Sequence, residues 1–133
     1  MTKHGFSTIL PADFDQVDDL NRRVKMFLSQ KQIDLNIDDV LLGIREALMN
    51  AIRHGCANKP ACKIVFSLSL GAECLVVKIE DQGPGFNWQQ EIEKKMPELT
   101  EGGRGLHIIQ LYFDSISYNA TGNTIELKKY FIT

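Results

Sequence analysis

Residues 41–55 constrain the fold more than any other stretch, because their two faces differ in chemistry. Apolar residues recur at a spacing of about 3.6 and predict an amphipathic helix packed on a core. This apolar face consists of Leu41, Ile44, Leu48, Ala51 and Ile52. The opposite face is a narrow stripe of Gly43, Glu46, Asn50 and His54. Taken alone, such a stripe is more often a solvated surface than a binding site.

The same stripe also has the chemistry of a site. Glu46 lies one turn before Asn50; its carboxylate can accept a proton, and the Asn50 carboxamide oxygen can bind a hard cation such as Mg²⁺. Gly43 inside a helix costs about 1 kcal/mol relative to alanine, so this position indicates a need for space. The helix alone does not separate the two interpretations, a solvated face and a ligand site.

Length and charge limit the classes of function. A chain of 133 residues fits one domain, residues 1–133, that buries its own core. Its net charge of −2 gives no reason to expect binding to nucleic acid or to an anionic membrane. No apolar run approaches the roughly 20 residues of a membrane span, and the N-terminus lacks a signal-peptide pattern. We therefore expect a cytoplasmic protein.

The three cysteines, Cys56, Cys62 and Cys74, are odd in number and fit no disulfide framework. Free thiols agree with a reducing compartment. His54 is close to Cys56 and Cys62, but the spacing lacks a Cys-x-x-Cys pair, which argues against zinc. We expect the cysteines to be free thiols that pack as small apolar side chains.

Strand and helix patterns continue along the chain. A short β-prone segment ends at Pro11, which predicts an edge strand, and Asp13 opens an amphipathic helix. The central helix is capped by Asn36 or Asp38 and ends at Gly55, interpreted as a C′ glycine. Further strands are predicted at residues 63–70, 73–81, 115–119 and 124–132, and a helix at residues 106–113.

One predicted strand ends in a carboxylate on its inner side. The alternation of apolar and polar residues over 75–80 places Asp81 on the buried side of the sheet. A carboxylate that points inward requires a partner. Asp81 is followed by Gly83 and Gly85, which flank a proline, and such a segment lets the backbone approach a ligand closely.

A second glycine-rich segment, residues 102–105, precedes the predicted helix at 106–113. A glycine-rich loop that leads into a helix N-terminus is a ready anion site, because unpaired N–H groups point at the ligand. Arg104 adds a bidentate donor for phosphate. Each segment alone is a weak signal, whereas the three in this order are much more specific.

The three segments read Glu46-x-x-x-Asn50-Ala51-x-x-His54, Asp81-x-Gly83-x-Gly85-Phe86 and Gly103-Arg104-Gly105-Leu106. In this order they resemble the N, G1 and G2 boxes of the GHKL ATPase superfamily. The motif Glu-Ala-Leu-x-Asn-Ala-x-x-His-Gly at residues 46–55 is typical of small serine kinases that act as anti-sigma factors, the RsbW and SpoIIAB type. The short segment between the last two boxes is also typical of them. The resemblance covers nearly the whole chain.

This resemblance implies an α/β fold of the α+β two-layer kind: a mixed, mostly antiparallel sheet covered on one face by helices, the Bergerat-type ATP-binding fold. It also implies ATP and Mg²⁺. Asn50 would bind Mg²⁺, Glu46 would be the general base for a serine hydroxyl, and Asp81 would accept a hydrogen bond from the adenine amino group. Gly83 and Gly85 would pass close to the nucleotide. The phosphates would be wrapped by Gly103, Arg104, Gly105 and Leu106.

The resemblance further implies a homodimer that phosphorylates a STAS-domain anti-anti-sigma protein on serine and binds a sigma factor or analogous regulator. The alternative is a nucleotide-dependent protein clamp with little or no kinase activity, and Glu46 discriminates the two because a clamp can lose its base. A histidine phosphotransfer module is disfavoured by the missing acceptor hairpin. No role is assigned to Arg53, His54, Trp88 or His107.

Overall fold

The computed structural model describes residues 4–59, 61–82, 108–120 and 123–131. Its strands are β1 (Gly5–Pro11), β2 (Lys63–Leu70), β3 (Cys74–Asp81), β4 (Ser115–Tyr118) and β5 (Thr124–Tyr130). Its helices are α1 (Phe14–Ser29) and α2 (Ile37–Asn50), and α2 continues as a π-helical turn, Ala51–Gly55. Residues 108–112 are also helical. None of the helices in these ranges is long and apolar enough to cross a membrane.

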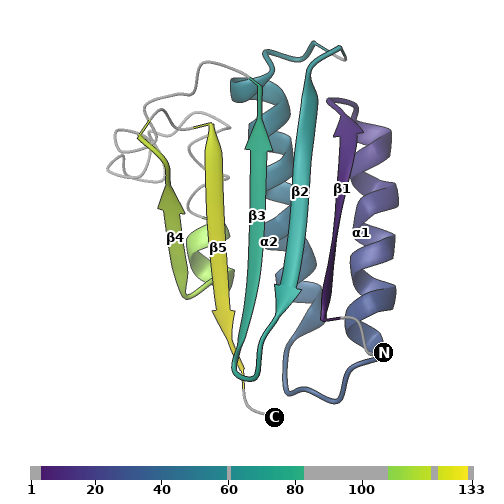
Figure 1. Cartoon of the computed structure of the whole chain (residues 1–133), viewed down its shortest axis with the longest axis vertical. Coiled ribbons are helices and arrows are strands. Elements are labelled where there is room, and N and C mark those ends of the chain that lie inside the picture. Colours follow the sequence, from purple (N-terminus) through teal and green to yellow (C-terminus); the bar gives the residue numbers. More distant parts are fainter. Residues whose placement is uncertain (1–3, 60, 83–107, 121–122, 132–133) are drawn as a thin grey trace.

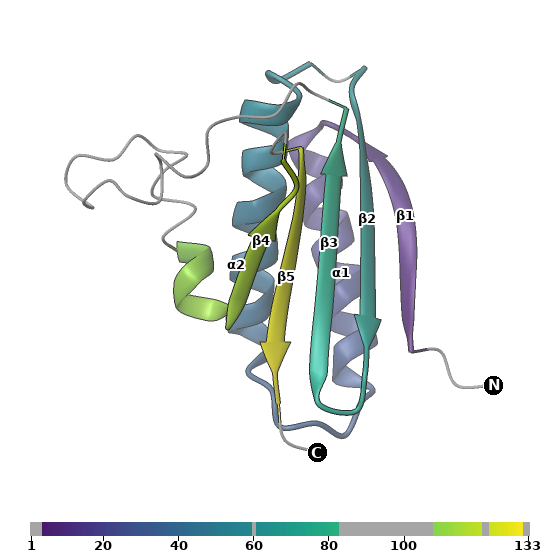
Figure 2. The same ribbon diagram turned by 60° about the vertical axis from the view of Figure 1, so that its left-hand side comes forward.

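The five strands form one sheet in the order β1-β2-β3-β5-β4 (Figure 1). All four pairings between these strands are antiparallel. Helices α1 and α2 lie together on one face of the sheet, as the turned view shows (Figure 2). This arrangement confirms the predicted two-layer α+β fold. The predicted sheet was mixed, but no parallel pair occurs among the described strands.

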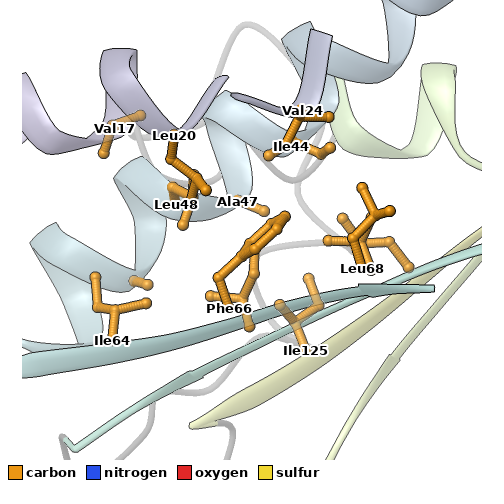
Figure 3. Close-up of a cluster of buried hydrophobic side chains, with 14 of the residues drawn as sticks. Val17, Leu20, Val24, Ile44, Ala47, Leu48, Ile64, Phe66, Leu68 and Ile125 are labelled. Atoms are coloured by element: carbon orange, nitrogen blue, oxygen red, sulfur yellow. The ribbon is translucent and has the colours of Figure 1, made fainter. Parts of the chain in front are cut away.

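The core fills the space between the sheet and the two helices (Figure 3). Phe66 at the centre of β2 is fully buried, and the helices cover it with apolar side chains. Burial of each large apolar side chain contributes about 1.5–3 kcal/mol, which fixes how the helices sit on the sheet. The covering side chains from α1 and α2 include Val17, Leu20, Val24, Ile44, Ala47 and Leu48.

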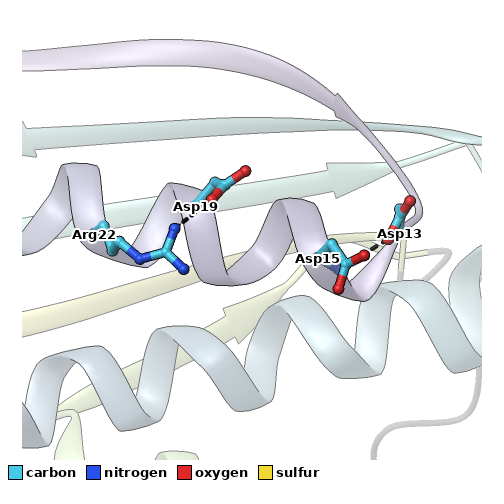
Figure 4. Close-up of polar contacts among 4 residues, drawn as sticks. All are labelled: Asp13, Asp15, Asp19 and Arg22. Atoms are coloured by element: carbon cyan, nitrogen blue, oxygen red, sulfur yellow. Dashed lines mark hydrogen bonds and ion pairs between the residues drawn. The ribbon is translucent and has the colours of Figure 1, made fainter.

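Helix α1 begins where its acidic cap predicts. Asp13 is the N-cap, and its Oδ1 accepts a hydrogen bond of 2.8 Å from the backbone N–H of Asp15 (Figure 4). Such a cap contributes about 1 kcal/mol. Arg22 and Asp19 form an ion pair one turn further on, but both side chains are exposed, so it adds little to stability.

The two ends of the central helix differ in how well the sequence predicted them. Asn36, rather than Asp38, is the N-cap, and its Oδ1 accepts from the backbone N–H of Asp39 at 3.1 Å. The interpretation of Gly55 as a left-handed C′ glycine is wrong, because Gly55 lies within the π-helical turn and its φ is outside the left-handed range. The described non-glycine residues with positive φ are Ala57 (51°) and Asn58 (59°). The helix therefore ends by a turn built from non-glycine residues.

The expectation of three free thiols is also wrong. Cys56 and Cys62 form a disulfide with their Cα atoms 5.6 Å apart, whereas Cys74 is free. The physical reason lies in the left-handed turn at Ala57 and Asn58, which directs the chain back toward the helix end. Ala57 gives no sign of this reversal in the sequence, although asparagine, as at position 58, is enriched in the left-handed conformation.

Candidate functional site

Asn50 is buried at the end of α2, with 4% of its surface exposed. Within the part of the chain that the structure describes, its side-chain Nδ2 and Oδ1 have no hydrogen-bond partner. A buried polar group left without a partner costs about 1–3 kcal/mol, so the Asn50 carboxamide is a candidate to bind a ligand, an ion or water. The interpretation of the polar stripe as a solvated surface is therefore wrong at Asn50.

Asp81 closes β3 and points to the buried side, as the strand alternation predicted; 6% of its surface is exposed. Its backbone N–H donates to the carbonyl of Asn123 at 2.9 Å. On its other side, Asp81 pairs with Ile64 of β2. Backbone contacts on both sides thus hold Asp81 at the end of the sheet.

Gly55 reaches Asp81 from the helix layer. A Cβ atom added at Gly55 would overlap both the Cγ atom and the carboxylate oxygens of Asp81. Because real Cβ atoms do not approach other atoms so closely, only glycine allows the last turn of the helix to lie on the carboxylate. The glycine serves this close approach, and not the left-handed conformation that the sequence suggested.

A narrow pocket of about 10 Å³, about the volume that one water molecule needs, lies between α2 and the sheet. Its walls combine apolar side chains with a few converging polar groups. The chemistry of these walls matches a flat, mostly apolar ligand with a polar edge, and the pocket would have to widen to admit one. The lining residues are Ala47, Asn50, Ala51, Ile79, Asp81, Tyr118, Asn123 and Ile125.

Tyr118 and Asn123 line this pocket although the sequence did not suggest them. Burial first, and the charge of Asp81 second, raise the pKa of the Tyr118 phenol, so it is a neutral hydroxyl at physiological pH. Asn119 contacts the start of β5, because its Oδ1 accepts from the N–H groups of Asn123 at 3.0 Å and Thr124 at 3.2 Å. Strand β4 has only four residues, too few for alternation to reveal an inward tyrosine.

The other predicted site residues lie outside this pocket or outside the described ranges. Glu46 is half-buried on α2 and is not among the lining residues. The structure thus brings Asn50 and Asp81 into one pocket, while Glu46 lies one helical turn away. The remaining predictions concern residues that the structure does not describe, namely Gly83, Gly85, Gly103, Arg104, Gly105 and Leu106.

Gly43 has a structural explanation. A Cβ atom at this position would lie 2.5 Å from Cε2 of Phe113, so the phenyl ring occupies the space that the missing side chain leaves. Phe113 is buried and directly follows the short helix at residues 108–112. The predicted need for space is confirmed, and its cause is a ring from a distant part of the chain.

The chain is similar to known proteins over most of its length. Residues 10–129 match the family described as histidine kinase-like ATPase domain. An anti-sigma F factor from Clostridium acetobutylicum is 32% identical over 71% of each chain. The anti-sigma F factor of Bacillus subtilis strain 168 is 28% identical over 74% of this chain and 75% of its own. The serine-protein kinase RsbW of the same strain is 25% identical over 71% of this chain and 64% of its own.

Proposed function

Because the chain belongs to the histidine kinase-like ATPase (GHKL) domain family, we propose that it is an ATP-dependent serine-protein kinase that acts as an anti-sigma factor. One observation carries this proposal. The pocket combines the inward carboxylate of Asp81 with the buried carboxamide of Asn50, which has no partner among the described residues. Relatives named anti-sigma F factor and serine-protein kinase RsbW support the choice of activity.

The adenine end of ATP would bind next to Asp81. The carboxylate would accept a hydrogen bond from the exocyclic amino group, and Ile79 and Ile125 would contact the faces of the base. The neutral Tyr118 hydroxyl adds a donor at the same edge. Asp81 is largely shielded from solvent, and the helix end lies directly on its carboxylate at Gly55.

The phosphate end would lie toward Asn50. Its carboxamide oxygen is a hard ligand and is free of protein partners in the described residues, so it fits Mg²⁺. Mg²⁺ bound there would neutralise phosphate charge. Glu46 would accept the proton of the attacking serine hydroxyl, one turn away on the same helix. The remaining phosphate contacts would come from Gly103, Arg104, Gly105 and Leu106, and Gly83 and Gly85 would lie along the nucleotide.

The proposed partners do not follow from the surface of this chain. From the names of the relatives we propose a sigma factor or analogous regulator as the sequestered partner. From the resemblance of the three sequence segments we propose a STAS-domain anti-anti-sigma protein as the phosphorylated substrate. As an anti-sigma factor, the protein would act as a homodimer in the cytoplasm, without direct contact with nucleic acid or membrane.

A second candidate function is a nucleotide-dependent clamp that sequesters a regulator without phosphoryl transfer. The position of Glu46 supports the clamp as a second candidate, because the residues that line the pocket do not include this general base. Nucleotide binding would therefore be complete without Glu46, and a clamp could work with the pocket alone.

A transfer assay separates the two functions. The protein is incubated with Mg²⁺-ATP and a purified STAS-domain protein from the same genome, and phosphoserine is sought by mass spectrometry. We expect one phosphoserine on the STAS-domain protein. ATP binding without transfer would instead identify the clamp, and absence of ATP binding would contradict both functions.

Gly55→Ala is expected to weaken ATP binding by at least about tenfold, because the added methyl group displaces the Asp81 carboxylate or the helix end. Calorimetric titration measures the change, and circular dichroism checks the fold. Gly71→Ala is a matched control, since a Cβ atom there would meet its nearest neighbour, the Cys74 carbonyl oxygen, at an ordinary 3.4 Å. Equal affinity in both variants would contradict the close approach of Gly55 to Asp81.

A further inference from the structure

The disulfide between Cys56 and Cys62 lies beside the pocket. Cys56 directly follows Gly55, the residue whose backbone lies on the Asp81 carboxylate. Cys56 itself is buried, with 4% of its surface exposed, and its N–H donates to the Ala51 carbonyl at 2.8 Å. One half of the disulfide is therefore part of the helix end that covers Asp81.

The other half of the disulfide is attached to the sheet. Cys62 directly precedes β2, and its carbonyl accepts from the N–H of Ala12 at 3.0 Å. The next residue, Lys63, donates its N–H to Oε1 of Gln82 at 3.0 Å, and Ile64 pairs with Asp81. The disulfide thus joins the helix end to the strand next to Asp81.

Small reagents can reach this disulfide. Both cysteines line an open hollow of about 400 Å³ together with Gly55, Lys59 and Gln82. Cys62 is partly exposed, whereas Cys56 is buried. Attack on the sulfur of Cys62 is therefore the accessible route, with Cys56 as the leaving group.

We propose that Cys56 and Cys62 form a reversible dithiol–disulfide site that sets the nucleotide affinity of the adjoining pocket. This inference rests on the proposed ATP binding. The disulfide connects the two segments that hold Asp81 from opposite layers, so opening it releases the helix end from β2. The oxidised form binds nucleotide more tightly than the reduced form.

Reduction needs a thiol reductant of low molecular weight. Its thiolate attacks Sγ of Cys62, the sulfur–sulfur bond breaks, and Cys56 leaves as a thiolate that takes up a proton. A second reductant thiolate attacks the mixed disulfide and releases Cys62, which is protonated in turn. The protein gains two electrons and two protons, and the reductant becomes its own disulfide. Oxidation by a small disulfide reverses these steps.

Coupling between the two sites has a measurable consequence in both directions. We expect reduction to weaken ADP binding by about fivefold, the lower end of typical coupling between sites. Because such coupling is reciprocal, saturating ADP must shift the dithiol–disulfide equilibrium toward the disulfide by the same factor.

The test titrates ADP into the full chain by calorimetry, in its oxidised form and after reduction. Thiol alkylation and mass spectrometry then report the disulfide fraction in glutathione buffers with and without ADP. Cys74→Ser is the control and keeps the response, since Cys74 lies at the opposite end of β3, roughly 23 Å from Asp81 at the usual strand rise. Cys56→Ser and Cys62→Ser each bind ADP as the reduced wild type does and no longer respond to reductant.

The outcomes distinguish this inference from the proposed function. Equal ADP affinity in the oxidised and reduced wild type would overturn the inference and leave ATP binding intact. Absence of ADP binding in both forms would overturn the proposed function and the inference with it. The comparison of ADP affinity in the oxidised and reduced wild type uses no substitution, so its result does not depend on whether a serine variant folds.

Discussion

Glu46→Gln is expected to lower the rate of phosphoryl transfer to a partner protein by about 10²–10⁴-fold, the usual contribution of a general base. Glutamine keeps the shape of the side chain but cannot take the proton of a serine hydroxyl. Glu46 lies one turn before Asn50 on α2 and does not line the pocket, so ATP affinity stays within a few-fold of the wild type. Loss of transfer with retained binding is the result that assigns the base.

Transfer is measured by the appearance of phosphoserine on the STAS-domain protein, and ATP affinity by calorimetry. Glu73→Gln is the matched control, because this exposed glutamate precedes β3 at the end of the strand opposite to Asp81. Transfer at the wild-type rate in Glu46→Gln would show that another group takes the proton.

Asp81→Asn is expected to weaken adenine nucleotide binding by about 10- to 100-fold, since a hydrogen bond to a charged group contributes about 1.5–3 kcal/mol. The substitution keeps the size of the side chain under Gly55 and removes its charge. An amide can turn its N–H group toward the base, so discrimination between ADP and GDP also falls.

Calorimetric titrations of ADP and GDP measure both effects. Asp34→Asn serves as the control, because Asp34 is exposed in the segment before α2. An unchanged ADP titration in Asp81→Asn would remove the adenine end of the nucleotide from this pocket and place it elsewhere.

The features predicted correctly from the sequence depend on short-range periodicity. The inward direction of Asp81 follows from strand alternation over a few residues, and the apolar face of α2 follows from helical spacing. The burial of Asn50 could not be predicted from the helix alone, because the sheet that covers it consists of strands far along the chain. The spacing therefore indicates which face of α2 is apolar, but not what surrounds Asn50.

The features that the sequence did not reveal depend on contacts between distant residues. The sequence suggests the wrong reason for glycine at position 55, because the residue that requires it, Asp81, is 26 positions later in the sequence. Gly43 indicated a need for space, but not that Phe113 fills it. The disulfide is different, because its cysteines are six positions apart and their approach depends on the left-handed turn at Ala57 and Asn58. Local patterns carry no information about the contacts of Gly55 and Gly43.

The π-helical turn after α2 shifts the residues that follow Asn50 by one position relative to an α-helix. The N–H of Cys56 donates to the carbonyl five residues earlier, at Ala51, so the turn contains one residue more than an α-helical turn. The residue that lies on Asp81 therefore comes five positions after Asn50, at Gly55, and not four positions after it, at His54.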